Sequence, residues 1–318
     1  MSQKTHRLGV VMDPIAAIKP VKDSTLAMLL EAQRRGWEIS YLEMGDLSIR
    51  DGTARGHARP LTVADDTASW FRLGNPADLA LGELDAILMR KDPPFDMEYV
   101  YATYVLGRAE ADGALVINRS GALRDINEKA YTMWLAECCP PTLITRSHRE
   151  MTAFVAEHGR VVVKPLDGMG GKSIFVIRED DPNTNVILET LTDYGSRFAM
   201  AQRYIPEIVA GGDKRVLVID GEPYPYALAR IPAPGDNRGN LAAGARAEGR
   251  PLTERDRWIA ETAGQVLKEQ GVLFAGLDVI GDYLTEVNVT SPTCIRELDR
   301  EYGDNIAGLL FDAIEARL

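Results

Sequence analysis

Lysine and glycine residues in the middle of the chain have the spacing of a phosphate-binding site. In the stretch VVVKPLDGMGGKSIFVI, residues 161–177, an apolar run ends at Lys164 and is followed by Gly168, Gly170 and Gly171. Glycine lets a ligand approach the backbone closely, and free backbone N–H groups beside a cation form an anion cradle. A Walker loop would need glycine at position 166, and a dinucleotide fingerprint would need it at position 173. The stretch therefore predicts a hairpin with another type of phosphate-binding loop, and Lys129 upstream could reach the same ligand.

Three oxygen-bearing side chains near the C-terminus have the spacing of a metal site. Glu286 and Asn288 are two positions apart on an expected strand, so they share a face. Asp278 joins that face only if the connection near Gly281 has an odd length or a bulge, because a plain two-residue turn pairs Asp278 with Thr285. Carboxylate and amide oxygens on one face suit Mg²⁺ with phosphate oxygens. A solvated edge strand is the alternative, but apolar residues on the opposite face favour the metal site.

Two arginines are expected to face the same way on a second hairpin. A two-residue turn at Asp220 and Gly221 is a strong hairpin signal and would place Arg215 opposite Tyr226. Tyr226 shares its face with Arg230, so the two guanidinium groups would lie on the order of 13 Å apart along the sheet. This spacing predicts an extended polyanionic ligand.

A segment rich in Gly, Ala and Pro, residues 231–249, follows this hairpin and has no periodicity. A structureless stretch of this length inside a domain is usually a lid or disordered. Its arginines, Arg238 and Arg246, would add movable cations.

Composition limits the classes of partner. The chain has 318 residues, with 36 basic and 47 acidic side chains and a net charge of −11. This acidic balance excludes a general nucleic-acid or anionic-membrane binder. No apolar run is long enough to span a bilayer. The three cysteines form neither a disulfide framework nor a zinc motif, which predicts a reduced, cytoplasmic protein.

The order of the expected elements predicts an α/β protein with three domains. Strands and helices alternate over residues 1–123, which indicates a parallel sheet covered by helices. Residues 124–202 contain the glycine hairpin in a small α+β unit, and residues 203–318 contain the two C-terminal hairpins. Residues 45–82 are rich in turns and cannot be assigned.

Several blocks resemble bacterial glutathione synthetases, a family of the ATP-grasp superfamily. A lysine before a helix, a lysine beside a glycine loop and an Asp…Glu-x-Asn trio are general ATP-grasp features. The blocks specific to the family occur in order over essentially the whole chain: VMDPIA, LMRKDPPFD, KPLDGMGGKSIF, DKRVLVIDGEP, RGNLAAG and LTEVNVTSPTCIRE. The resemblance implies an ATP-grasp fold with an N-terminal parallel α/β domain, a small α+β lid domain and a C-terminal mixed-sheet domain.

The resemblance also implies a reaction. ATP phosphorylates the C-terminal carboxylate of γ-glutamylcysteine, and the amine of glycine attacks the acyl phosphate to give glutathione, ADP and phosphate. The implied cofactors are ATP as co-substrate and two Mg²⁺ or Mn²⁺ ions, and the implied assembly is a homotetramer. Phosphoryl transfer relies on positioning and charge neutralisation, which agrees with a site built from lysine, arginine and metal ligands.

The family's binding and catalytic roles can be assigned to most of the candidate residues by their positions in the matching blocks. The groups implied to hold ATP are Lys129, Lys164, the flap glycines Gly168, Gly170 and Gly171, Tyr204 and Ile205 at adenine, and Asp213 at ribose. The implied metal ligands are Asp278, Glu286 and Asn288. Arg215 and Lys164 would be catalytic, with Arg215 stabilising the acyl phosphate and the tetrahedral intermediate. The implied substrate-binding residues are Arg90, Arg230, Arg238, Asn240 and Ser291, under a lid formed by residues 231–249.

Three alternatives remain at the level of the sequence. Another ATP-grasp ligase could join a different acid and amine, and the blocks around Arg90 and Arg238 would distinguish it. A non-catalytic nucleotide sensor would be expected to lack Glu286 or Asn288, and both are present. A Rossmann-type oxidoreductase would need glycines after the first strand, where Asp13 and Pro14 stand instead.

Overall fold

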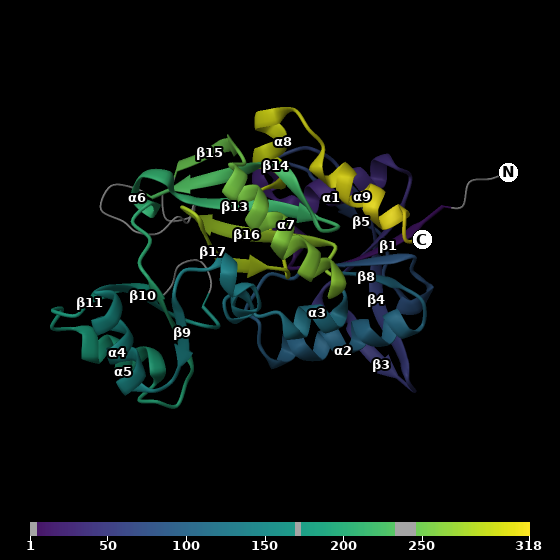
Figure 1. Cartoon of the computed structure of the whole chain (residues 1–318). Coiled ribbons are helices and arrows are strands. Elements are labelled where there is room, and N and C mark those ends of the chain that lie inside the picture. Colours follow the sequence, from purple (N-terminus) through teal and green to yellow (C-terminus); the bar gives the residue numbers. More distant parts are fainter. Residues whose placement is uncertain (1–4, 169–172, 233–245) are drawn as a thin grey trace.

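The computed structural model describes residues 5–168, 173–232 and 246–318, and these ranges form three sheets (Figure 1). The sheets have eight, four and five strands in the described chain. The N-terminal and C-terminal sheets lie close together, whereas the four-stranded sheet and its helices stand apart at the lower left of the figure.

The N-terminal sheet has the predicted parallel centre. Its parallel strands occur in the order β2 (Glu38–Leu42), β1 (Arg7–Val11), β7 (Ala86–Met89) and β8 (Leu115–Ile117). Helix α1 (Ser24–Arg34) follows β1, and α2 (Met97–Ala111) connects β7 to β8. Asp23 caps α1 by accepting a hydrogen bond from Leu26 N at 2.7 Å.

The unassigned residues 45–82 add antiparallel strands to this sheet. They contain β3 (Leu47–Arg50), β4 (Thr53–Val63), β5 (Phe71–Leu73) and β6 (Ala77–Ala80). Strand β4 pairs antiparallel with β2 and with β3, β5 and β6, so the parallel sheet acquires an antiparallel edge. Burial alternates along β4, which is the signature of a half-buried strand that the surrounding turns obscured in the sequence.

The small domain is an antiparallel sheet with two helices. Its strands occur in the order β11 (Phe175–Arg178), β10 (Arg160–Pro165), β12 (Ala199–Arg203) and β9 (Thr142–Thr145). Helices α4 (His148–His158) and α5 (Thr184–Thr192) pack on it over a separate apolar core. The predicted hairpin around the glycine loop is confirmed, because Val161 pairs with Ile177 across β10 and β11.

The C-terminal sheet was predicted to be mixed, but it is antiparallel in the structure. Its strands occur in the order β15 (Arg246–Pro251), β14 (Glu222–Ile231), β13 (Asp213–Ile219), β16 (Phe274–Ile280) and β17 (Tyr283–Asn288). Every described pair in it is antiparallel, so parallel and antiparallel pairs mix in the N-terminal sheet instead. Hairpins link most of these strands, and after α7 (Glu254–Glu269) the chain returns with β16 antiparallel to β13.

The two faces of the C-terminal sheet have different neighbours. One face packs on α7, where Ile259 and Ala263 join the core residues Val216 and Leu277. The other face packs on α8 (Ile295–Tyr302) and α9 (Ile306–Glu315), which also contact α1 of the N-terminal domain. Side chains on this second face therefore lie between the two large domains.

The segment between β8 and β9 contains two short helical pieces. A short α-helix, α3 (Ser120–Asp125), ends before a 3-10 segment, η5 (Ala130–Cys138), and Lys129 stands directly ahead of η5. Among the described helices, none is both long and apolar enough to cross a membrane.

Candidate active site

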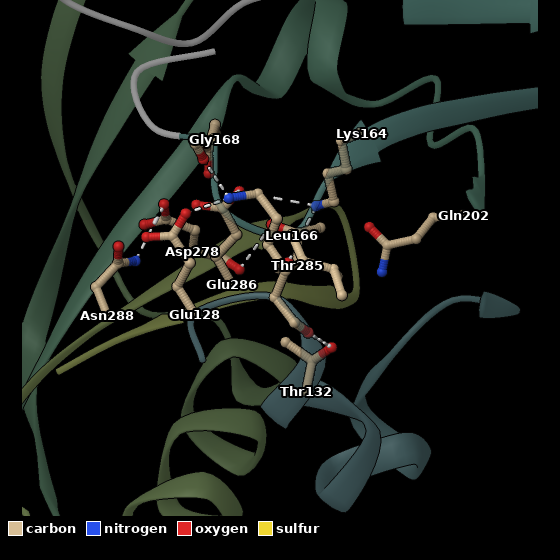
Figure 2. A network of polar contacts seen from close by, with 12 residues as sticks. Glu128, Thr132, Lys164, Leu166, Gly168, Gln202, Asp278, Thr285, Glu286 and Asn288 are labelled. Atoms are coloured by element: carbon tan, nitrogen blue, oxygen red, sulfur yellow. Dashed lines mark hydrogen bonds and ion pairs between the residues drawn. The ribbon is translucent and has the colours of Figure 1, made fainter. Parts of the chain in front are cut away.

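The two candidate lysines meet at the junction of the small and C-terminal domains, where Figure 2 shows Lys164 close to Thr285 and Glu286. Lys129 and Lys164 are only 1% and 4% exposed. The Lys129 ammonium contacts Glu128 and donates a hydrogen bond to Gly168 O at 2.5 Å, while Lys164 Nζ donates to Thr285 O at 3.3 Å. Both Nζ atoms lie beside Glu286 Oε1, at 3.7 and 3.8 Å. The structure thus brings together Lys129, Lys164 and Gly168, whereas Gly170 and Gly171 lie outside the described residues.

Burial sets the charge balance around these lysines. Burial lowers the pKa of Lys164. Burial also opposes the charge of Lys129, but Glu286 and Glu128 outweigh it and raise the pKa of Lys129. The pKa of Glu128 is raised by burial and by the nearby Glu286. Burial therefore disfavours the charged form of Lys164, and the negative charge of a bound phosphate would offset this cost.

The C-terminal hairpin has the predicted register. Asp278 pairs with Glu286, and Asn288 Nδ2 lies 3.5 Å from Asp278 Oδ2 (Figure 2). The turn itself has two residues, because Ile280 pairs with Tyr283, and the register shifts between Asp278 and Val279. A bulge at Thr285 therefore brings Asp278 onto the face of Glu286.

The same bulge gives Lys164 its partner. Thr285 is the additional residue of β17, and its side chain donates a hydrogen bond to Asp278 O at 3.0 Å. Its carbonyl accepts the hydrogen bond from Lys164. A residue outside the regular ladder can direct its backbone groups to a partner outside the sheet. The bulge therefore aligns the predicted metal ligands and also anchors a lysine of the small domain.

Arg215 and Arg230 converge on Asp278, which corrects their predicted separation. Arg215 forms two hydrogen bonds to the Asp278 carboxylate, at 2.5 and 2.9 Å, and Arg230 Nη2 lies 3.0 Å from Asp278 Oδ2. The register shifts between Val216 and Val218, so Arg215 pairs with Leu228 and not with Tyr226. The shift leaves Arg230 only two residues from Leu228, the partner of Arg215, so both arginines reach one carboxylate.

These arginines keep Asp278 ionised. Burial alone would raise the pKa of Asp278, but Arg215 and Arg230 outweigh it and hold the pKa well below its usual range. Asp213 also pairs with Arg230, at 2.5 Å, yet burial raises the pKa of Asp213 to about 7. Asp213 Oδ1 is buried and has no hydrogen-bond partner among the described residues, which agrees with a carboxyl group that is easily protonated.

The oxygen donors fit a hard divalent cation in kind. Asp278 and Glu286 supply carboxylates and Asn288 supplies an amide oxygen, the ligand types that Mg²⁺ prefers. Within the described chain, no three His, Cys, Asp or Glu side chains already form a metal-binding cluster. Asp278 is engaged by arginines, so binding a cation would require its carboxylate to exchange partners.

One face of β16 aligns the charged groups between the large domains. Phe274, Gly276 and Asp278 alternate onto this face. A Cβ at Gly276 would come within 2.8 Å of Arg215 Cδ, so only glycine lets this arginine lie across the strand. The Arg90 guanidinium lies over the Phe274 ring, 5.9 Å from its centroid. The strand therefore places Arg90 and Arg215 along one line.

Two of the candidate substrate-binding residues, Arg90 and Ser291, are in contact, and their role at the substrate stays a prediction. Arg90 is 5% exposed and donates hydrogen bonds to Thr25 Oγ1 at 3.1 Å and to Pro292 O at 2.8 Å. Ser291 Oγ donates to Arg90 O at 3.3 Å. Burial lowers the pKa of Arg90. The contact joins β7 of the N-terminal domain to the segment after β17.

The two residues predicted to bind adenine follow β12 directly and are buried. Tyr204 and Ile205 are both buried, and the Arg160 guanidinium lies 3.6 Å from the centroid of the Tyr204 ring. Their role at adenine stays a prediction.

The predicted lid has structure at both ends. Ile231 ends β14, and Arg246 begins β15 and pairs with it, so residues 246–249 belong to a strand. Arg246 forms an ion pair with Glu248 at 2.9 Å on this strand, and its assignment to a movable loop is wrong. Arg238 and Asn240 lie outside the described residues. The Gly and Ala content of β15 hid the strand in the sequence.

Sequence reasoning missed Glu128 and Thr25. Glu128 contacts Lys129. Its backbone oxygen accepts a hydrogen bond at 2.7 Å from the N–H of Val287, the residue between the metal-ligand candidates Glu286 and Asn288. Thr25 holds Arg90 from the first turn of α1. The only signal for Glu128 was its place beside a candidate lysine, and no local signal pointed to Thr25.

Comparison with known proteins decides the family. Residues 7–124 match the model of the prokaryotic glutathione synthetase N-terminal domain, and residues 128–303 match that of the prokaryotic glutathione synthetase ATP-grasp domain. The chain belongs to the prokaryotic glutathione synthetase family.

Individual members of this family are similar over nearly their whole length. The chain is 60% identical to glutathione synthetase of Pseudomonas aeruginosa over 312 residues, covering 98% of both chains. It is 58% identical to glutathione synthetase of Escherichia coli strain K12, also covering 98% of both chains. The predicted function, an ATP-dependent ligase of glutathione biosynthesis, is confirmed at the level of the family.

A solved structure confirms the ATP-grasp fold. The D-cycloserine synthetase DcsG superposes with a TM-score of 0.67 at 17% identity, covering 98% of this chain and 99% of that one. At this identity the likeness concerns the fold alone. ATP binding is inherent to the fold, and ATP-grasp ligases use divalent metals with it.

Proposed function

We propose that the chain joins γ-glutamylcysteine to glycine through an acyl phosphate on the cysteinyl carboxylate. The γ-phosphoryl group of ATP passes to a carboxylate oxygen and ADP departs. The glycine amine then attacks the acyl carbon, loses a proton, and phosphate leaves. The observation that carries the proposal is the convergence of four cations around Asp278 and Glu286, the buried Lys129, Lys164 and Arg215 and the partly buried Arg230. Such a site neutralises phosphate charge without a covalent nucleophile.

Lys129 and Lys164 hold the ATP phosphates in this proposal. Their ammonium groups come from two elements but share Glu286, so one phosphate chain could contact both. Lys129 already contacts Gly168 O at the base of the glycine flap, which Gly170 and Gly171 extend over the nucleotide. Tyr204 and Ile205 line the adenine pocket, and Asp213 approaches the ribose after release from Arg230.

Asp278, Glu286 and Asn288 would hold the divalent ions. The family resemblance implies that two ions bind. When bound, the ions neutralise charge on the phosphates. Asp278 suits this role because its carboxylate stays ionised, and its exchange between arginine and metal would couple nucleotide binding to the freeing of Arg215.

Arg215 acts on the transferred group. Its guanidinium lies flat against Gly276 and offers paired donors, a geometry that matches phosphate and carboxylate oxygens. Freed from Asp278, it stabilises negative charge on the acyl phosphate and on the tetrahedral intermediate. The rest of the predicted lid, between β14 and β15 and including Arg238 and Asn240, would keep water from the acyl phosphate, which hydrolyses when exposed.

Arg90, Arg230 and Ser291 bind the charged groups of the dipeptide. They lie on the same side of the C-terminal sheet as Asp278, in the region where the N-terminal domain packs. The homotetramer, the cytoplasmic location and the domain boundaries at 123 and 202 stay predictions.

The test is ADP release in the presence of ATP and Mg²⁺. Release should require γ-glutamylcysteine and glycine together, with glutathione identified by mass and formed in equal amount to ADP. Equal or faster turnover with another acid and amine would instead assign the chain to a different ligase reaction on this fold. A rate of ADP release that is the same with and without γ-glutamylcysteine and glycine would contradict the proposal.

A further inference from the structure

Several charged residues lie at the carboxyl ends of β1 and β7, and Arg90 alone among them has a role in the proposed reaction. The two strands are adjacent and parallel, but the chain leaves β1 towards β2 on one side and reaches β7 on the other. Ligands of α/β proteins bind at such a switch point, because the connections diverge there. The charged residues at this end are Asp13, Asp23, Arg90, Lys91 and Asp92.

Arg90 is a buried cation held by neutral groups. The hydrogen-bond partners of its guanidinium in the described chain, Thr25 Oγ1 and Pro292 O, carry no charge, and the residue is only 5% exposed. Burying a guanidinium that donates no hydrogen bond to a carboxylate of the described chain is costly, so an anionic ligand would stabilise the site. A carboxylate suits the planar guanidinium because it can accept two hydrogen bonds.

We propose that Asp23 binds the ammonium group at the γ-glutamyl end of the dipeptide, while the carboxylate on the same carbon binds Arg90. The inference rests on the proposed function, in which Arg90 binds the dipeptide. An ammonium and a carboxylate on one carbon need an acid and a base side by side. Asp23 and Asp92 are the carboxylates whose charge acts on Arg90.

Asp23 is the acid best placed for this role. Asp13 is already used, because it pairs with Lys91 at 3.0 Å and accepts a hydrogen bond from Asp92 N at 3.0 Å. Asp92 is exposed to water. Asp23 is partly buried, and burial raises its pKa although Leu26 N and Arg90 oppose the rise. A carboxylate that caps a helix keeps further lone pairs for a ligand.

The spacing along β16 fits the length of the dipeptide. Arg90 lies over Phe274, and Arg215 lies over Gly276, two residues further along the same face. Two residues of a strand, or two extended residues of a peptide, span about 7 Å. A dipeptide held at Arg90 by its γ-glutamyl end would therefore present its cysteinyl carboxylate near Arg215 and Asp278, where phosphoryl transfer takes place.

The experiment compares two substrates on two variants. N-glutarylcysteine lacks only the ammonium group of γ-glutamylcysteine, so the ratio of their kcat/KM values measures recognition of that group. The wild type should prefer γ-glutamylcysteine by about 10- to 100-fold, the value of one charge-assisted hydrogen bond. Asp23→Asn should bring the ratio close to one by losing activity on γ-glutamylcysteine alone. Asparagine caps helices as well as aspartate, so α1 should remain folded.

Asp96→Asn is the matched control, because Asp96 caps α2 by the same type of hydrogen bond, to Tyr99 N at 3.0 Å. It should keep the wild-type ratio. Asp23→Ser, another capping substitution, should reproduce the loss of discrimination. If the Asp23 variants lower kcat/KM equally for both substrates, or leave the ratio of the two values unchanged, Asp23 only caps its helix and the inference is wrong. If the wild type does not use γ-glutamylcysteine with glycine, the proposed function fails first and the inference fails with it.

Discussion

The lysine pair and the arginine pair carry similar charge but are held in different ways. Lys129 and Lys164 come from different elements, contact backbone carbonyls and share Glu286. Arg215 and Arg230 lie on neighbouring strands of one sheet and close on one carboxylate, Asp278. The arginine pair is therefore assembled by the sheet, whereas the lysine pair depends on how the small domain docks against β17.

This difference separates binding from chemistry. The small domain stands apart from the rest of the molecule in Figure 1. A lysine on this domain can therefore move with it when the nucleotide binds. The arginines are fixed by strand register, and fixed donors stabilise developing charge without reorganisation. We therefore expect changes at the lysines to alter nucleotide affinity most, and changes at the arginines to alter turnover most.

The largest effect is expected from Arg215→Lys. Lysine keeps the charge but loses the paired donors, so kcat should fall by about 100-fold or more while the KM for ATP changes little. Steady-state ADP release at saturating γ-glutamylcysteine and glycine measures both constants. Arg317→Lys, at an exposed pair with Asp220, is the control and should behave as wild type. A loss confined to the KM for ATP would contradict the division between the pairs.

Lys164→Ala should weaken ATP binding by about 10- to 100-fold, because one charged hydrogen bond to phosphate is lost. The fold should persist, since Lys129 still balances Glu286. Calorimetric titration with a non-hydrolysable ATP analogue measures the affinity, and circular dichroism checks the fold. Lys268→Ala, beside Asp220 at the surface, is the control. Unchanged affinity would show that Lys164 does not contact phosphate.

Asp213 should give stability a distinct dependence on pH. Burial raises its pKa from 3.8 to about 7 in the folded state, so the folded protein binds a proton more tightly than the unfolded chain. The stabilisation from Asp213 is then fully present below about pH 4 and is lost as pH rises through about 7. Between these values the wild type should lose up to about 1.4 kcal/mol per pH unit relative to Asp213→Asn. Urea unfolding of both proteins at several pH values measures the difference, and parallel curves would refute it.

The smallest effect is expected from Thr285→Val at the bulge. The substitution removes the hydrogen bond to Asp278 O and keeps the side-chain shape, so the free energy of unfolding should fall by about 1 kcal/mol. Activity should stay within a few-fold of wild type, because the carbonyl that contacts Lys164 belongs to the backbone. Thr190→Val removes a similar bond on exposed α5 and should cost less. A large loss of ATP affinity would mean that the bulge itself depends on this hydroxyl.

Local patterns predicted much of the fold and the identity of most candidate residues. The alternation of strands and helices predicted the parallel sheet of residues 1–123, and side-chain alternation with turn residues predicted the strands of both C-terminal hairpins. The same patterns failed for β4 and β15. Their alternation is masked by turn residues in one case and by glycine and alanine in the other, so the neighbouring strands decide their conformation.

The sequence by itself determined which groups are present: the lysines beside a glycine loop, the Glu-x-Asn pair that alternation places on one face, and the arginine-rich hairpin. Tertiary structure alone decided which of them meet. Two register shifts, at Thr285 and near Leu217, moved Asp278 beside Glu286 and brought Arg215 and Arg230 to the same carboxylate. A shift of one residue costs little locally, and the packing of both sheet faces selects it, so no local pattern records it.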